Sequence, residues 1–244
     1  MSNKSSNYVP TIDVVISRFN EDLEWIHNSP YVDFFNRRNV RVIVYNKGNN
    51  SEFSTFSGWH VVGLPNIGMC DHTYLYHITD NYDRLAEITI FLPGSLELPD
   101  KAIKSARLIQ EICEMNSAVF IHNHYDEDGI QNNLYHFQLD NWTTRSSRTH
   151  EICLPTSLEP AEIRPFGAWF DTRFGPMIEP RLTYLGIFSV DRRDILQHSF
   201  DRYHAFLSEI PEHTANSEVV HYIERSWCAI FHPITHTKFV TGCW

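Results

Sequence analysis

The sequence predicts an α/β fold: a single domain with a mainly parallel central sheet flanked by helices. Segments with apolar residues at helical spacing separate short runs of β-branched residues, and such alternation is typical of a parallel sheet. The chain has 244 residues, of which 42% are hydrophobic, and this is enough for one full core. Without an internal repeat or a linker, we expect one domain over 1–244, with halves at 1–125 and 126–244. The runs that predict strands in the first half are 12–16, 40–45, 88–92 and 118–121.

The opening strand, 12–16, ends at a polar loop that runs from Ser17 to Asp22. We expect a helical segment over 21–35 that is interrupted at Pro30, because proline cannot continue a helix. The second strand, 40–45, closes at the turn signal Asn46-Lys47-Gly48, and a loop rich in Ser and Asn follows over 49–58.

Two further helices belong to the first half. The first is expected over 71–85, with Asp71 as its cap and Leu75, Ile78, Tyr82 and Leu85 on its apolar face. The strand 88–92 then stops at Pro93-Gly94-Ser95. The next helix is capped by Asp100 and precedes the strand 118–121. Its expected apolar face consists of Ile103, Ala106, Ile109 and Ile112.

The second half of the chain is less regular. The segment 125–181 is rich in aromatic residues, proline and turn residues, and we expect it to shape a binding surface at one edge. An apolar strand follows over 182–190. Helical periodicity then predicts two helices, over 192–210 and 217–231.

Charge and composition narrow the class of partner. The net charge of -10 argues against nucleic acid, because phosphates need a basic field. Five scattered cysteines without a C-x-x-C pair fit a reducing compartment. No apolar run reaches the length of a membrane span, and no signal peptide is recognisable. We therefore expect a cytoplasmic protein.

Polar residues follow the first three strands, and ligands of open parallel sheets bind beyond the carboxyl ends of the strands. A glycine turn then opens the helix near residue 71, and the N–H groups of a helix start suit a diphosphate. The turn lacks the glycine spacing of a dinucleotide fingerprint or a P-loop. The predicted ligand site comprises Ser17, Arg18, Asn20, Glu21, Tyr45, Asn46, Lys47, Asn66, Gly68, Asp71, His72, Tyr74, Gly94 and Ser95.

Short motifs spread over most of the chain carry a family resemblance. They are the polar loop 18–22 with Trp25, Val-Tyr-Asn-Lys-Gly at 44–48, Asn66-x-Gly68 with Thr73-Tyr74-Leu75, Asn81-Tyr82-Asp83, Ile90-Phe91-Leu92, Arg164-Pro165-Phe166 with Trp169, Gly186-Ile187-Phe188, and Glu224-Arg225-Ser226-Trp227. On these motifs the chain resembles a poorly characterised family of fungi, algae and large algal viruses. That family has a predicted glycosyltransferase fold (GT-A-like and Rossmann-related). Where it commonly has Arg-Glu after the glycine, this chain has Met69-Cys70, and Asp71 is the substitute carboxylate.

The resemblance implies a glycosyltransferase that moves a hexosyl or pentosyl group from a nucleotide-sugar donor, most plausibly a UDP-sugar, to a hydroxyl of a glycan acceptor. The donor would lie over the strand ends and the glycine turn. The acceptor would lie against the 140–170 segment, since aromatic faces suit the apolar side of a sugar ring. The expected acceptor-binding residues are Trp142, Arg164, Phe166 and Trp169.

The helix expected over 217–231 supplies two candidate catalytic carboxylates, Glu224 and Glu218. Glu224 lies at the edge of an apolar face formed by Val220, Ile223 and Trp227. A partly desolvated carboxylate there suits a general base that deprotonates the acceptor in an inverting reaction. Glu218 projects away from that face, and we expect it to be solvated near the positive end of the helix dipole.

The need for a metal stays open. Many glycosyltransferases of this fold hold Mn²⁺ or Mg²⁺ through a D-x-D motif after a strand, but here Pro93-Gly94-Ser95 occupies that place. Asp126 and Asp128 form a candidate displaced D-x-D motif.

Two other functions remain open. The segment His122-Asn123-His124-Tyr125-Asp126-Glu127-Asp128 is similar to the H-x-H-x-D-H motif of metallo-β-lactamase-like zinc hydrolases. Glu127 stands in place of the last histidine, and Asp191, His198 or His221 would complete the ligand set. The third hypothesis is a sugar- or nucleotide-binding protein without catalytic activity.

Overall fold

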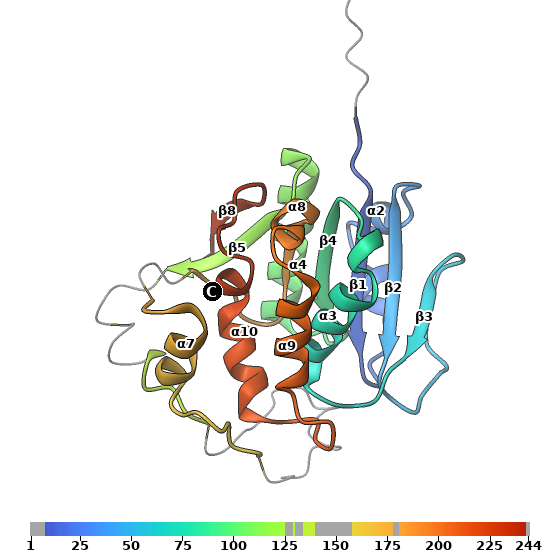
Figure 1. The fold of residues 1–244 in the computed structure, drawn as a ribbon. Coiled ribbons are helices and arrows are strands. Elements are labelled where there is room, and N and C mark those ends of the chain that lie inside the picture. The colour runs from blue at the N-terminus through green and yellow to red at the C-terminus, as the bar shows by residue number, and fades with distance from the viewer. Residues whose placement is uncertain (1–7, 125–128, 130–133, 140–157, 178–180, 243–244) are drawn as a thin grey trace, which may run out of the picture.

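The computed structural model describes residues 8–124, 129, 134–139, 158–177 and 181–242 (Figure 1). They form a mixed α/β domain around a five-stranded sheet with the order β3-β2-β1-β4-β7. Four strands are parallel and β7 is antiparallel to β4. The predicted fold class is confirmed. The strands are β1 (Ile12–Arg18), β2 (Val40–Asn46), β3 (His60–Gly63), β4 (Ile88–Pro93) and β7 (Phe188–Asp191).

The central strand β1 is buried along its whole length. Its run of β-branched residues covers both faces of the sheet, as expected of a strand with helices on either side. Ser17 pairs with Tyr45 of β2 and with Pro93 of β4, so the three strands end at one level. The chain runs from β1 outward to β2 and β3, then returns to the other side of β1 as β4. This reversal creates a topological switch point between β1 and β4.

The strand predicted at 118–121 is β5 (Val119–His124), but it does not belong to the main sheet. It pairs with β6 (Arg181–Leu182) and β8 (Lys238–Thr241) in a second, three-stranded sheet. The place beside β4 is taken by β7. The Ser189 hydroxyl of β7 accepts from Val119 N (2.7 Å) and donates to Val119 O (2.8 Å), so one side chain links the two sheets.

Helices cover both faces of the main sheet (Figure 1). One face carries α3 (Met69–Asp80), α9 (Phe200–Ser208) and α10 (Glu218–Ile230), whose apolar residues join those of α7 (Phe166–Phe174) in one core cluster. The opposite face carries α1 (Glu24–His27), α2 (Val32–Phe35) and α4 (Pro99–Met115). No described helix combines the length and the apolar character that a membrane crossing needs.

Several boundaries differ from the prediction. The predicted break at Pro30 is confirmed, because α1 and α2 are separate helices. The helix expected over 71–85 ends at Asp80, and a 3-10 turn, Tyr82–Arg84, follows it. The helix expected over 192–210 is two helices, α8 (Arg192–Leu196) and α9. The sequence prediction also missed β3, α7 and β8.

The strand expected over 182–190 is interrupted between β6 and β7. Leu185 and Gly186 have φ angles of 72° and 64°, which lie in the left-handed region and end the extended backbone. The turn that they form contacts α3.

Three predicted features of the helices in the first half are wrong. Asp71 does not cap α3, because the helix begins two residues earlier, after Gly68 with φ of 56°. Asp100 does not cap α4, whose N-cap is Leu98. Ile103 was expected on the apolar face of α4 but is 59% exposed, whereas Lys104 is buried. The ammonium of Lys104 donates to Thr183 Oγ1 (2.7 Å) and Tyr184 O (2.6 Å), and these bonds turn this side of the helix inward.

Glu218 at the start of α10 is fully buried, so the expectation that it is solvated is wrong. Its Oε1 accepts from Leu139 N (2.8 Å) and Arg164 Nη2 (3.1 Å). Its Oε2 accepts from Ala161 N (2.9 Å) and lies 2.6 Å from Arg164 Nε. The carboxylate therefore ties two loop segments to the first turn of α10.

We expect Glu218→Ala to lower the free energy of unfolding by about 3–5 kcal/mol, because it leaves Arg164 and two amides without their anion. Urea denaturation measures the change. Glu212→Ala, at an exposed position in the preceding loop, is the matched control and should stay within about 0.5 kcal/mol of the wild type. Equal unfolding midpoints for the two variants would contradict the assigned role of Glu218.

Candidate functional site

The switch point between β1 and β4 gathers the polar residues that follow the parallel strands. Gly94 N donates to Ser17 O (2.7 Å), and Lys47 N donates to Arg18 O (2.8 Å). The segments after β1, β2 and β4 are thus bonded to one another just beyond the sheet. Ligands of open α/β sheets bind at this place.

Arg18 holds together the loops at this edge of the sheet. It is fully buried, and its guanidinium donates to Glu21 O (2.7 Å), Asn46 Oδ1 (2.6 Å) and Asn50 O (2.7 Å). It also stacks over Phe53, 3.8 Å from the ring centroid. Arg18 thus holds the loops after β1 and β2 together, and its contact with a donor stays a prediction.

Glu21 and Gly94 approach each other closely. Glu21 Oε2 accepts from Phe19 N (2.6 Å), and a Cβ at position 94 would meet the same oxygen at 3.0 Å. Asn20 Oδ1 accepts from Asn50 N (3.1 Å) in the neighbouring loop. The lack of a side chain at Gly94 therefore lets the β4 loop close against the β1 loop.

Two lysines make the edge cationic. The Lys47 ammonium donates to Ile67 O and Met69 O and so lies at the N-terminal end of α3. Its burial lowers its pKa to about 8, and the charges of Cys70, Asp71 and Glu21 act in the opposite direction. Lys101, in the first turns of α4, donates to Ser95 Oγ (2.6 Å). A helix N-terminus between two ammonium groups is a favourable environment for an anion.

A pair of carboxylates lies beside these lysines. Asp71 Oδ1 accepts from the Trp227 indole (2.8 Å). Its pKa is raised well above the usual value, first by burial and then by the negative charge of Glu224. Burial and the nearby charge of Glu224 therefore both favour the neutral form of Asp71.

Glu224 lies at the margin of the core, as the sequence predicted. Its side chain is 21% exposed, whereas Val220 and Trp227 on the same helix are fully buried. Glu224 Oε1 accepts from Leu185 N (2.9 Å), in the left-handed turn between β6 and β7. Oε2 is 3.8 Å from Arg225 Nη1, which is a long ion pair.

Gly186 allows this turn to lie against α3. A Cβ at that position would come within 2.8 Å of Cys70 Sγ, and Tyr74 Oη donates to the Gly186 carbonyl (2.8 Å). The amide that holds Glu224 is therefore placed by direct contact between the turn and the helix that carries Asp71.

The structure brings together Ser17, Glu21, Lys47, Gly68, Asp71, Gly94, Ser95 and Glu224 from the predicted set. Asn46 serves the Arg18 network, and Asn66 is exposed. Two other predicted donor-binding residues lie in the core: Tyr45, which bonds to His77 Nδ1 (3.0 Å), and Tyr74. His72 is buried beside Lys47, and burial followed by that lysine's charge lowers its pKa to about 4.

The predicted acceptor residues do not form an exposed platform in the part of the chain that the structure describes. Phe166 and Trp169 are buried in the core, and the Trp169 indole donates to Glu209 Oε2 (3.1 Å). Arg164 holds Glu218. Trp142 lies outside the described residues.

Part of the zinc motif lies outside the described residues, so the zinc hypothesis stays a prediction. His122 packs edge-on against Phe239, while Asp126 and Asp128 lie outside the described residues, as does Glu127. The other proposed ligands have separate partners: Arg193 for Asp191, His232 O for His198 and Asn216 for His221. Among described residues, no three His, Cys, Asp or Glu side chains are grouped to hold a metal.

Two members of the site were missed by the sequence prediction: Lys101 and the Leu185 amide. No local pattern marks the Leu185 amide, because its role depends on a turn formed far along the chain from α3.

Comparison with known proteins gives a family but no activity. A family model described as "Protein of unknown function (DUF3431)" matches residues 14–243. The match begins within β1 and extends past the end of β8. No curated protein matches the chain.

Burial lowers the pKa of Lys104 to about 7, from an ordinary value of 10.5. Between these two values the unfolded chain binds more protons at this lysine than the folded chain, so its contribution to stability rises with pH. We expect the free energy of unfolding of the wild type to rise from pH 7 to pH 8.5 relative to that of Lys104→Met.

Urea denaturation at both pH values measures this difference. Lys101→Met, on the same helix and partly exposed, is the matched control and should follow the wild-type pH dependence. A Lys104→Met curve parallel to both would show that this lysine does not titrate on unfolding.

Proposed function

We propose that this chain, which belongs to the DUF3431 family of unknown function, is a glycosyltransferase that uses a nucleotide-sugar donor. One observation supports the proposal: a positively charged helix N-terminus and a partly desolvated carboxylate lie at the same edge of the sheet. Lys47 and Lys101 supply the positive charge, and Glu224 supplies the carboxylate.

The cationic end suits the diphosphate of a donor. Transfer breaks the bond between the anomeric carbon and the diphosphate oxygen, so negative charge develops on the leaving nucleoside diphosphate. Groups already oriented toward that charge stabilise the transition state. Lys47 is held in place by two carbonyl groups, and the N–H groups of the first turn of α3 lie next to it.

Glu224 suits the role of general base. An acceptor hydroxyl attacks the anomeric carbon and gives its proton to the carboxylate, as an inverting transfer requires. The Leu185 amide orients Oε1, while Oε2 lies 3.8 Å from Arg225 Nη1. Burial raises the pKa of neighbouring Asp71, and this disfavours a second negative charge beside the donor diphosphate.

The donor class is the first testable consequence. We expect UDP-glucose or another UDP-sugar to bind, and Lys101→Ala to weaken its affinity about tenfold or more, because one cation at the diphosphate is lost. Isothermal titration calorimetry measures both. Lys238→Ala, on the exposed edge of β8, removes the same charge elsewhere and should bind as the wild type does.

The titrations are run with and without EDTA. Because Pro93-Gly94-Ser95 provides no carboxylate after β4, we expect binding to persist in the chelator. No heat with any common nucleotide sugar, with or without manganese, would refute the donor assignment.

We expect Glu224→Gln to fold and bind donor normally but to lose about 10²–10⁴ in turnover, the typical contribution of a general base. Release of UDP from a UDP-sugar measures turnover, with water as the stand-in acceptor. The amide keeps the shape of the side chain and its contact with Leu185 N. Glu212→Gln is the control, and thermal melting reports on folding.

A Glu224→Gln variant that melts far lower, with little loss of rate per folded molecule, would make this carboxylate structural. A variant that is neutral in both measurements would place the base elsewhere.

A further inference from the structure

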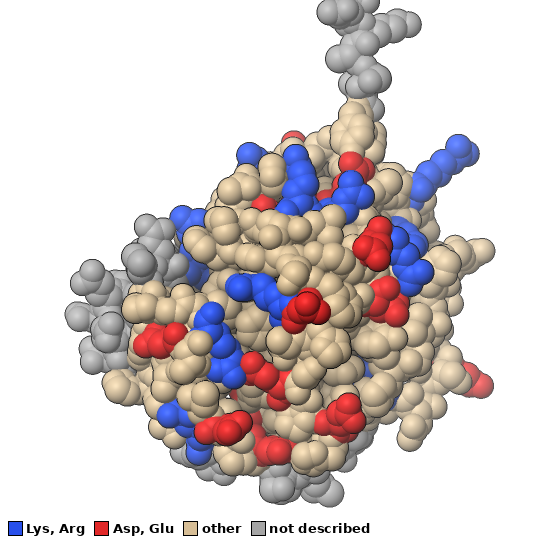
Figure 2. All heavy atoms as spheres, in the orientation of Figure 1, with Lys and Arg blue, Asp and Glu red and all other residues tan. Residues whose placement is uncertain are grey.

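Lys104 of α4 places a cation in the interior of the protein. On the surface over α9 and α10, acidic and basic side chains are interspersed, and water screens their charges (Figure 2). Lys104, by contrast, is only 1% exposed. Its ammonium donates to Thr183 Oγ1 (2.7 Å) and Tyr184 O (2.6 Å), which are neutral acceptors. These two bonds therefore orient the ammonium without cancelling its charge.

The carbonyl that accepts from Lys104 belongs to the same peptide group as the amide that donates to Glu224. Leu185 N is bonded to the Tyr184 carbonyl carbon, and it donates to Glu224 Oε1 (2.9 Å). In a trans peptide the C=O and N–H groups point in opposite directions, and resonance couples them. One peptide dipole thus lies between a buried cation and a carboxylate, and each charge is at the end of the dipole that attracts it.

The turn that contains this peptide group is held on both sides. Thr183 Oγ1 donates to Ile187 O (3.2 Å) and so links the two ends of the turn. Tyr74 Oη of α3 donates to Gly186 O (2.8 Å). Rotation of the peptide group away from its two charged partners would disturb these contacts, so the arrangement is fixed by the fold.

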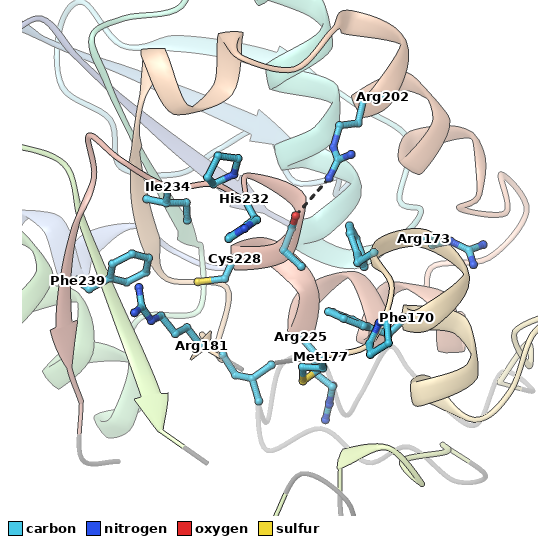
Figure 3. Close-up of a pocket in the computed structure, with 15 residues that line it drawn as sticks. Phe170, Arg173, Met177, Arg181, Arg202, Arg225, Cys228, His232, Ile234 and Phe239 are labelled. Carbon is cyan, nitrogen blue, oxygen red and sulfur yellow. Dashed lines mark hydrogen bonds between the residues drawn. The ribbon is translucent and has the colours of Figure 1, made fainter. Parts of the chain in front are cut away.

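Protein surrounds the ammonium of Lys104. Burial lowers its pKa to about 7, and the charges of Glu224 and then of Cys228 act in the opposite direction. Burial also raises the pKa of Cys228, so its thiol is neutral near pH 7. Cys228 lines a cavity of about 590 Å³ together with Arg225, but Lys104 is not among the described lining residues (Figure 3). In such an enclosed environment, hydrogen bonds that form a chain strengthen one another.

We propose that Lys104 is a positioning residue for Glu224 and that it acts through the Tyr184–Leu185 peptide group. The charged ammonium polarises the Tyr184 carbonyl, and the Leu185 N–H becomes a stronger donor to Glu224 Oε1. Oε1 is thereby held in place, and Oε2 is left to accept the proton of the acceptor. This role in the reaction rests on the proposed transferase function, whereas the coupling of the two charges is a property of the folded chain.

The coupling depends on pH. Because the pKa of Lys104 is about 7, the coupling is lost as the pH rises through this value. The other titratable or charged groups that act on the pair are Cys228 on Lys104, and Cys70, Asp71, Tyr74, His221 and Arg225 on Glu224. Burial raises the pKa values of Cys70 and Tyr74 and lowers that of His221 to about 4, so these three do not titrate near pH 7. Asp71, whose pKa is also raised, requires a control variant.

The test observes the peptide group directly. The sequence contains two Tyr-Leu pairs, Tyr74–Leu75 and Tyr184–Leu185. Labelling of the tyrosine carbonyl carbon with ¹³C and of leucine with ¹⁵N therefore gives two resonances in an HNCO NMR spectrum, one from the turn and one from α3 as a reference. In the wild type, we expect the Tyr184 carbonyl and the Leu185 amide to shift together as the pH rises, with a midpoint at the pKa of Lys104, about 7.

Variants separate the coupling from structural effects. Lys104→Met keeps the length of the side chain without its charge and should abolish the joint shift, whereas Lys238→Met, at an exposed position of β8, should leave it unchanged. Glu224→Gln should move the midpoint to lower pH, because the coupling between two charges is reciprocal. Asp71→Asn should retain the joint shift. Thermal melting of each variant reports on its folding.

In the proposed transferase, Lys104→Met should lower turnover about tenfold, a coupling typical of residues in one hydrogen-bond network, with unchanged donor affinity. In the Glu224→Gln background the same substitution should have no further effect, because Lys104 acts through Glu224. UDP release measures turnover, and calorimetry measures donor binding. A wild type without turnover would overturn the catalytic role of both residues, while the NMR spectra decide the coupling separately.

Two results would overturn the coupling itself. One is a Tyr184 carbonyl that shifts near pH 7 in Lys104→Met protein as it does in the wild type. The other is a Leu185 amide that stays constant while the Tyr184 carbonyl shifts, which would show that the peptide group transmits nothing to Glu224. The second result requires only the wild type, so it is decisive even where Lys104→Met does not fold.

Discussion

The parallel pairing of β1 with both β2 and β4 is the constraint on which the candidate site depends. Ser17, Tyr45 and Pro93 lie at one level across the three strands, so their loops leave the sheet together. Arg18 then binds the loops after β1 and β2 to each other from beneath. The reversal of strand order falls between β1 and β4. On the face opposite to α1, α2 and α4, α3 and α10 are joined by the bond from the Trp227 indole to Asp71.

Strands and helices with strong local patterns were predictable from the sequence. The face of α10 that contains Val220, Ile223 and Trp227 is buried as its spacing indicated, and Glu224 lies at its margin. The same reasoning failed for Lys104 and Glu218. Both are charged residues in the interior, and their burial depends on partners from distant segments, namely the Tyr184 carbonyl and Arg164. Helical spacing alone contains no information about such partners.

The place of β5 shows the same limit for strands. Its apolar run predicts a strand, but nothing local to Val119 determines which sheet it joins. That choice depends on β7, which occupies the edge of β4 and presents the Ser189 hydroxyl to Val119. The cavity lined by α7, α9, α10, β6 and β8 was also not predictable, because these five elements come from separate parts of the sequence.

The lack of a side chain at Gly186 restricts which substitutions the chain can accept during evolution. A methyl group there would press on the Cys70 sulfur and displace the turn whose amide holds Glu224. The φ angle of 64° adds a second restriction on the same residue. A larger residue at position 186 should therefore occur among relatives only together with a smaller residue at position 70. Such covariation would result from the contact between α3 and the turn and would not depend on the activity of the protein.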